Sequence, residues 1–268
     1  MSAHEIIERV VTLVVASKIL VPMREVKDGE LGGRAPDLSV PQIIREPIIE
    51  LVNDGWKRFL RIFAGKEMFL RKRVDPDYFN VKIDTAFGSK RFEHCYEKDW
   101  AKAEREGTSW VTSRVPAHKN CQLYEACLFV AVNRTWTLWH VDFQPASPSI
   151  TTLVSGWKLW LVCTQTELAR ELCRDSGRPE DLLKLLETGG ERLKHIQWAI
   201  QEEGDSIVLP WGLAHCVITL SERGKGSPAT TAMLSYVING SEDERMVRED
   251  WISQRFATNE RKGRSHGN

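Results

Sequence analysis

Two side chains in the stretch Trp139-His140-Val141-Asp142 have the types and the spacing to bind a metal ion. Side chains alternate between the two faces of a β-strand, so His140 and Asp142 would leave the same face. An imidazole and a carboxylate side by side are two of the three ligands in the facial triad that binds non-haem Fe(II). His215 fits the third position if it lies on a neighbouring strand. These residue types therefore make His140, Asp142 and His215 candidate ligands of one metal ion.

A structural interpretation of the same residues stays open. His140 could be a buried, hydrogen-bonded histidine, and Asp142 a turn carboxylate close to Pro145. Cys216 follows His215, and its sulfur could serve as a soft metal ligand. On a strand, however, it would point away from the face of His215, so we predict that it packs in the core.

Among the basic residues, Lys158 is the one that the sequence favours most for a functional role. It lies in the apolar run Gly156-Trp157-Lys158-Leu159-Trp160, where burial of a lysine is costly unless an anion faces it. The alternative is a lysine on an outer face whose ammonium group reaches solvent. Trp157 and Trp160 flank it and could line a pocket, although aromatic core is the simpler expectation.

The order of these motifs along the chain is more specific than any one of them. An H-x-D pair comes first, then the lysine, then a Gly-Asp pair, a Leu-Pro pair and the last histidine. In this order the segment from about Ala126 to Gly240 resembles the JmjC family of Fe(II)- and 2-oxoglutarate-dependent oxygenases. The resemblance implies that His140, Asp142 and His215 bind iron. It also implies that Lys158 pairs with the distal carboxylate of the co-substrate 2-oxoglutarate.

The resemblance adds three polar residues to the predicted co-substrate site. Thr137, three residues before His140, matches a position where some members place a hydroxyl against the same carboxylate. Ser149 and Ser235 lie roughly where members often carry an asparagine near the metal. The chain departs from the family pattern at both of these positions.

The second half of the chain predicts a mainly β fold with helical additions. Short β-branched runs broken by Gly and Pro are typical of a mostly antiparallel barrel. The expected strands are Leu123 to Val132, Thr135 to Phe143, Ile150 to Cys163, Ile207 to Leu209, Cys216 to Leu220 and Thr231 to Ile238. The resemblance implies that they form a double-stranded β-helix, the jelly roll of cupins.

Helical patterns dominate the N-terminal part and one insertion. Apolar residues recur at helical spacing from Ile6 to Val15 and from Pro47 to Gly65. Phe92 to Glu106 looks helical, and Tyr78 to Thr85 alternates like a strand. Lys27 to Pro41 is predicted to be a loop. The segment 164–190 predicts two helices bordering the mouth of the pocket. We therefore divide the chain into a helical region 1–120 that packs on the barrel, a catalytic barrel 121–256 with this insertion, and a polar tail 257–268.

The composition limits the partners. Lys+Arg and Asp+Glu both number 37, so no net field attracts nucleic acid or an anionic membrane. The first apolar run contains charges and is too short to cross a bilayer, so we expect no signal peptide and no membrane segment. The six cysteines form no C-x-x-C pair, which argues against a zinc finger and for reduced thiols inside the cell, in nucleus or cytoplasm.

The resemblance implies a dioxygenase that uses Fe(II), 2-oxoglutarate and O₂ on a protein substrate. The product would be a hydroxylated side chain or a demethylated amine, with histone lysine among the candidate substrates. Two other classes stay open: a non-catalytic JmjC-like scaffold that binds a protein partner, and a cupin-type hydrolase with zinc in the triad. Lys158 argues against both, because neither needs an anchor for a dicarboxylate.

Overall fold

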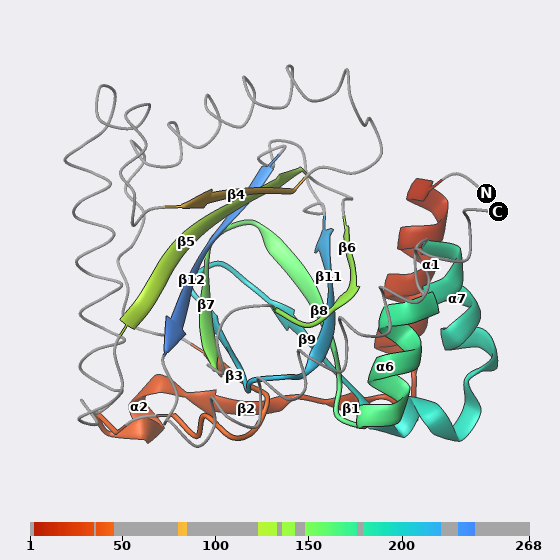
Figure 1. Cartoon of the computed structure of the whole chain (residues 1–268), viewed down its shortest axis with the longest axis horizontal. Helices are drawn as coiled ribbons and strands as arrows, with labels where there is room; N and C mark the ends of the chain where they lie inside the picture. Colours follow the sequence, from red (N-terminus) through yellow and green to blue (C-terminus); the bar gives the residue numbers. More distant parts are fainter. Residues whose placement is uncertain are drawn as a thin grey trace, which may run out of the picture.

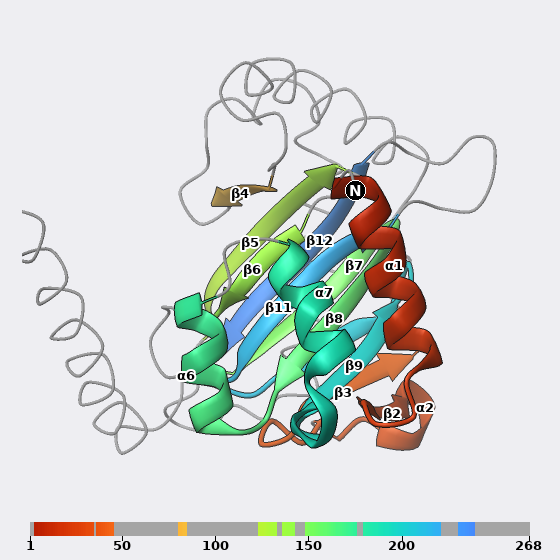
Figure 2. The same cartoon turned by 90° about the vertical axis from the view of Figure 1, so that its right-hand side faces the viewer.

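The computed structural model describes residues 3–34, 36–45, 80–84, 123–132, 136–142, 148–175, 179–220 and 230–238. In this part of the chain two β-sheets face each other, and helices cover the outer surface of one of them (Figures 1 and 2). The larger sheet contains, in order across it, β2 (Arg24–Lys27), β3 (Gln42–Arg45), β10 (Ser206–Leu209), β7 (Ser149–Ser155), β12 (Thr230–Ile238), β5 (Leu123–Val132) and β4 (Asn80–Asp84).

The smaller sheet carries most of the residues of interest. It contains, in order, β1 (Val21–Pro22), β9 (Ile196–Gln201), β8 (Trp157–Cys163), β11 (Ala214–Leu220) and β6 (Trp136–His140). Described neighbours in both sheets are antiparallel, except that β1 runs parallel to β9 and β2 to β3. The prediction of a mainly β, mostly antiparallel fold with helical additions is confirmed.

The strands from β5 to β12 pass back and forth between the two sheets. Successive strands change sheet at every step except the one from β8 to β9. This order places β6, which ends in His140, directly beside β11, which begins near His215. Two segments more than 70 residues apart in the sequence are therefore hydrogen-bonded neighbours.

An apolar cluster fills part of the space between the sheets. Trp160, Val162 and Val217 come from the smaller sheet, and Leu153 and Met233 come from the larger one. Because side chains alternate along a strand, these residues define which positions of each strand face the interior. On β8 the inward positions are 158, 160 and 162, and on β11 they are 215, 217 and 219.

A second apolar cluster lies on the outer face of the smaller sheet. It joins outward residues such as Leu159, Leu161 and Cys216 to apolar side chains of the helices. These helices are α1 (Ala3–Ala16), α6 (Thr166–Asp175) and α7 (Pro179–Thr188), and the short 3₁₀ helix η1 (Gly190–His195) follows α7. The two helices predicted in the insertion are present. The sequence predicts them at the pocket mouth, but their apolar faces instead cover the outer side of the sheet (Figure 2).

The N-terminal part contributes strands as well as a helix. The predicted first helix is α1, where Ile6, Val10 and Val14 are each no more than 1% exposed. The short helix α2 (Asp28–Leu31) occupies part of the predicted loop, and β1, β2 and β3 are not predicted by the sequence. They are two to four residues long, too short for a periodic pattern, and pairing with other strands is what makes them extended.

Other N-terminal predictions meet the structure only in part. β4 falls within the strand predicted between Tyr78 and Thr85. The helices predicted from Pro47 to Gly65 and from Phe92 to Glu106, and the tail 257–268, lie outside the described residues. Among the residues that are described, no helix has the length and the apolar composition needed to cross a membrane.

Candidate metal centre

His140, Asp142 and His215 lie together at one end of the smaller sheet. His140 is the last residue of β6 and pairs across the sheet with His215 on β11. Asp142 follows two residues later, where the chain has left the strand. One ligand atom from each of the three residues lies within 4.8 Å of the others. The strand pairing thus brings together the three residues that the sequence suggests as a triad.

The carboxylate of Asp142 faces both imidazoles. His140 Nε2 lies 3.5 Å from Asp142 Oδ1, and His215 Nε2 lies 3.8 Å from Asp142 Oδ2. The two histidine rings have their centroids 4.2 Å apart. The side chain of His215 is only 4% exposed, whereas those of His140 and Asp142 are 37% and 56% exposed. The group is therefore anchored in the interior at His215 and open to solvent at Asp142.

The surroundings of His215 favour a neutral ring. Burial, and then the neighbouring His140, lower the pKa of His215 to about 4, although Asp142 acts in the opposite direction. The His215 Nδ1 atom lies 3.1 Å from the carbonyl oxygen of Leu213. If Nδ1 carries the proton and donates it to this carbonyl, the lone pair of Nε2 points to the group and can bind a metal.

These residues fit a divalent transition metal. Two imidazoles and one carboxylate on one side of an ion leave its remaining positions open, as in the two-histidine, one-carboxylate sites of non-haem Fe(II) proteins. Cys216 does not join them, because it is 2% exposed within the cluster on the outer face of the sheet. The prediction that Cys216 packs in the core is confirmed.

Lys158 is buried on the same inner surface as the triad. It is 2% exposed, so its ammonium group does not reach solvent. The alternative of a lysine on an outer face, which requires contact with solvent, is therefore wrong. Its Nζ donates to Thr219 Oγ1 at 3.2 Å, and no carboxylate of the described residues forms an ion pair with it. Thr219 is four residues from His215 on the same strand, about 13 Å along it. Lys158 is thus a buried amine on the inner face, farther along the sheet from the triad, with a neutral hydroxyl as its neighbour.

The burial of Lys158 predicts how stability depends on pH. Desolvation lowers its pKa to about 7, from an ordinary value of 10.5. Between pH 7 and about pH 9 the unfolded lysine therefore keeps a proton that the folded one loses, and the free energy of unfolding should rise with pH. Above this range Cys163 and Cys216 oppose the trend, because burial raises their pKa values to about 11 and about 12.

Urea unfolding at several pH values between 7 and 9 measures this effect. The variant Lys158→Met keeps the length of the side chain and lacks the titrating group, so its stability should rise less over the same range. Equal slopes for the parent and Lys158→Met would show that the lysine keeps its charge in the folded state.

The three other predicted polar residues have different positions. The Thr137 hydroxyl accepts the N–H of Val217 at 3.0 Å and lies 3.4 Å from the carbonyl oxygen of the same residue, beside an irregularity in the pairing of β6 and β11. Ser149 is buried and pairs with Leu209, whose side chain lies between the sheets. Ser235 pairs with Thr151 in the middle of β12, and its side chain lies outside what the structure describes.

Two further residues bear on this group: the sequence names Trp160 only as a possible pocket wall or core residue, and it does not single out Gln201. The Trp160 indole is stacked on the His215 ring, with the centroids 5.8 Å apart and the planes at 27°, whereas Trp157 is exposed. Gln201 is fully buried and pairs with Lys158 across β8 and β9. The alternation of Ile196, Trp198 and Ile200 with the residues between them is a signal for this strand. A helical pattern in the same segment competes with it, and this strand is not among those predicted from the sequence.

Comparisons with known proteins add little to this picture. No family model and no curated protein matches the sequence. Among solved structures, a cupin 2 conserved barrel domain protein from Leptotrichia buccalis is 12% identical, with a TM-score of 0.28 over 60% of this chain and 41% of that chain. A recombinant oxalate oxidase in complex with glycolate is 11% identical, with a TM-score of 0.31 over 61% and 52%.

A third similar solved structure is that of a peptidase. Peruvianin-I, a cysteine peptidase from Thevetia peruviana latex, is 10% identical, with a TM-score of 0.28 over 44% of this chain and 50% of that chain. The chain spans about half the length of these structures. Scores and identities this low carry no argument about function, which is drawn from the residues of the chain itself.

Proposed function

We propose that this chain is an Fe(II)- and 2-oxoglutarate-dependent dioxygenase of the JmjC type that acts on a protein substrate. The observation that carries the proposal is the presence of two complementary features on one inner surface. A two-histidine, one-carboxylate group lies at the open end, and a buried lysine without a carboxylate partner among the described residues lies below it. A metal site alone would not require the second feature.

In this proposal His140, Asp142 and His215 hold the iron. When bound together, Fe(II) and 2-oxoglutarate supply the oxidation of a substrate C–H bond by O₂, with succinate and CO₂ as by-products. His215 is fixed in the interior, and Asp142 lies on the solvent side, so substrate would approach from the side of Asp142. A hydroxylated N-methyl group would break down to formaldehyde and an amine, and any other carbon would keep its hydroxyl.

Lys158 would bind the distal carboxylate of 2-oxoglutarate. Burial favours the neutral amine of Lys158 over its protonated form. An anion that enters the site would restore the protonated form. The ammonium group and the carboxylate would then form a charge-assisted hydrogen bond shielded from water. Thr137, Ser149 and Ser235 are proposed to line the same site, with Thr137 also holding the backbone of β11.

The proposed fold is the double-stranded β-helix of cupins, formed by the eight strands from β5 to β12. The support is the strand order: β5, β12, β7 and β10 are consecutive in the larger sheet, and β6, β11, β8 and β9 in the smaller one. Each set of four consists of strands that are mostly distant in sequence. Such an order arises when a long hairpin-like chain is wound between two sheets.

An anaerobic titration tests the function directly. Adding 2-oxoglutarate to the chain with Fe(II) should produce the weak visible charge-transfer band of the iron chelate, and replacing Fe(II) with Zn(II) should not. A hydrolase would bind Zn(II) without any response to 2-oxoglutarate, and a scaffold would bind neither. If no band forms at saturating Fe(II) and 2-oxoglutarate, the proposed function is wrong. If the band does form, a succinate-release assay with protein and methylated histone peptides would identify the substrate class.

A further inference from the structure

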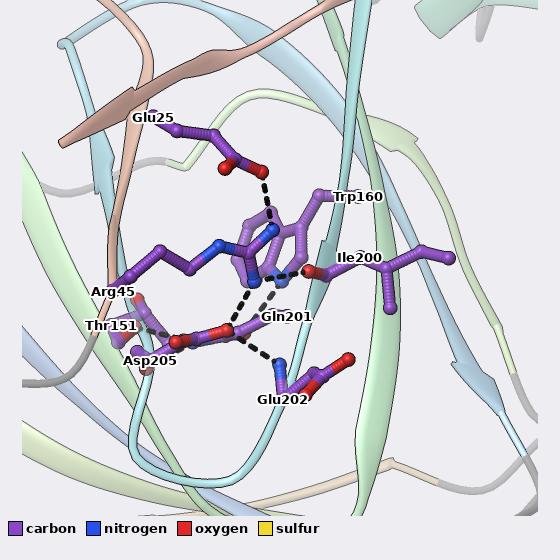
Figure 3. A network of polar contacts seen from close by, with 8 residues as sticks. All are labelled: Glu25, Arg45, Thr151, Trp160, Ile200, Gln201, Glu202 and Asp205. Atoms are coloured by element: carbon purple, nitrogen blue, oxygen red, sulfur yellow. Dashed lines mark hydrogen bonds and ion pairs between the residues drawn. The ribbon is translucent and has the colours of Figure 1, made fainter. Parts of the chain in front are cut away.

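The buried side-chain amide of Gln201, at the end of β9, belongs to a network of polar contacts that includes Trp160 (Figure 3). The Oε1 atom of Gln201 accepts the indole N–H of Trp160 at 2.7 Å. Its Nε2 atom donates to the carbonyl oxygens of Thr151 at 2.8 Å and Asp205 at 2.9 Å. Both amide hydrogens and the oxygen are therefore used, and a flipped amide would place its oxygen against two carbonyls. The partners leave Gln201 one orientation.

The backbone that anchors Gln201 is itself held by charged groups. The Asp205 carboxylate accepts the backbone N–H of Glu202 at 2.9 Å and pairs with the guanidinium group of Arg45. Arg45 also donates to the carbonyl of Ile200 at 2.9 Å and to the carboxylate of Glu25 at 2.6 Å. These contacts, drawn in Figure 3, tie the turn from β9 to β10 to the strands β2 and β3. Gln201 thus lies next to a turn that several hydrogen bonds and ion pairs join to the neighbouring strands.

The other end of this connection is the ring of His215, a proposed metal ligand. Trp160 lies against His215 with nearly parallel planes, and its N–H has Gln201 as partner. If the indole turned in its plane or away from the histidine, the buried N–H and the amide oxygen would both lose their hydrogen bond, which is costly in the interior. The bond therefore fixes the surface on which His215 rests.

We propose that Gln201 is a positioning residue of the metal centre, which holds Trp160 against His215 and so keeps His215 Nε2 turned toward Asp142. This inference rests on the proposed function, because it requires His215 to be a metal ligand. Gln201 itself binds no metal. Its effect passes through Trp160, and the two residues should therefore act as one unit.

Anaerobic Co(II) titration provides the test, because Co(II) binds such ligands and its visible spectrum reports their geometry. We expect the parent to bind Co(II). Trp160→Phe keeps an aromatic ring and loses the N–H, and Gln201→Met keeps the length and loses all three hydrogen bonds. Each should weaken Co(II) binding about tenfold, the lower end of the range for residues that orient metal ligands, and should shift the visible bands. The double variant should be no weaker than the poorer single variant, because the two residues share one pathway.

Thr152→Val is the matched control. It removes the buried 2.7 Å hydrogen bond between the hydroxyls of Thr152 and Ser206, on the side of β7 that faces away from the interior. It should lower the thermal midpoint and leave Co(II) binding unchanged. If Trp160→Phe behaves like this control while the parent binds Co(II), the positioning role is wrong and the metal centre stands. If the parent does not bind Co(II), the metal centre and the inference are both overturned. Trp160→Phe decides the matter even if Gln201→Met does not fold.

Discussion

Asp142→Ala is expected to abolish turnover and to weaken Fe(II) binding by at least about a hundredfold, because loss of a ligand should exceed the 10–100-fold that loss of a residue behind a ligand costs. The side chain lies between the two imidazoles and is 56% exposed, so its truncation removes the only negative charge of the group without opening a cavity. The fold should therefore survive. His140→Ala should likewise abolish turnover and weaken Fe(II) binding. Its fold should also survive, since the His140 side chain is partly exposed.

The measurement is the iron retained after anaerobic desalting, together with 2-oxoglutarate turnover measured as succinate. His195→Ala is the matched histidine control, because His195 lies in η1 and outside the triad. It should retain iron as the parent does. Turnover at the parent rate in Asp142→Ala or His140→Ala would show that the triad assignment is wrong.

The second large effect is expected from Lys158→Ala. A charge-assisted hydrogen bond contributes roughly 1.5–3 kcal/mol net, and each factor of ten in affinity corresponds to about 1.4 kcal/mol. Removing the buried ammonium group should therefore weaken 2-oxoglutarate binding by more than about tenfold. Iron binding should change little, because Lys158 is not part of the triad. The opposite distribution of effects is expected for Asp142→Ala, so the two variants separate the metal from the co-substrate.

A 2-oxoglutarate titration at fixed, saturating Fe(II) measures this prediction. Lys158→Arg should recover only part of the affinity, since a planar guanidinium group does not replace a compact ammonium group in a fitted site. Lys194→Ala serves as control, because the side chain of Lys194 is 55% exposed and away from the interior. An unchanged half-saturation point for Lys158→Ala would contradict the proposed contact and remove the best support for the oxygenase.

Local patterns in the sequence were enough to predict those features that depend on neighbouring residues. Alternation along a strand separates His215 from Cys216, which the structure places in the outer cluster. The two-residue spacing of His140 and Asp142 suggests that they lie together, although Asp142 lies beyond the end of β6. Capping residues and apolar spacing predict α1 and the two helices of the insertion. The long apolar run from Leu123 to Val132 predicts β5 with its observed bounds. Each of these signals extends over several residues of one element.

Only the tertiary structure decided the features that depend on pairing between distant segments. β1, β2 and β3 are too short to carry a pattern. The partners of β1 on β9 and of β3 on β10 lie more than 150 residues away, and β2 joins the sheet through β3. The outer position of α6 and α7 follows from the apolar outer face of the smaller sheet, which no single segment reveals. Gln201 reads as an ordinary polar residue at a strand end. Its importance comes from the indole of Trp160 and two carbonyls that the fold places around it, because a buried amide is stable only where every polar atom finds a partner.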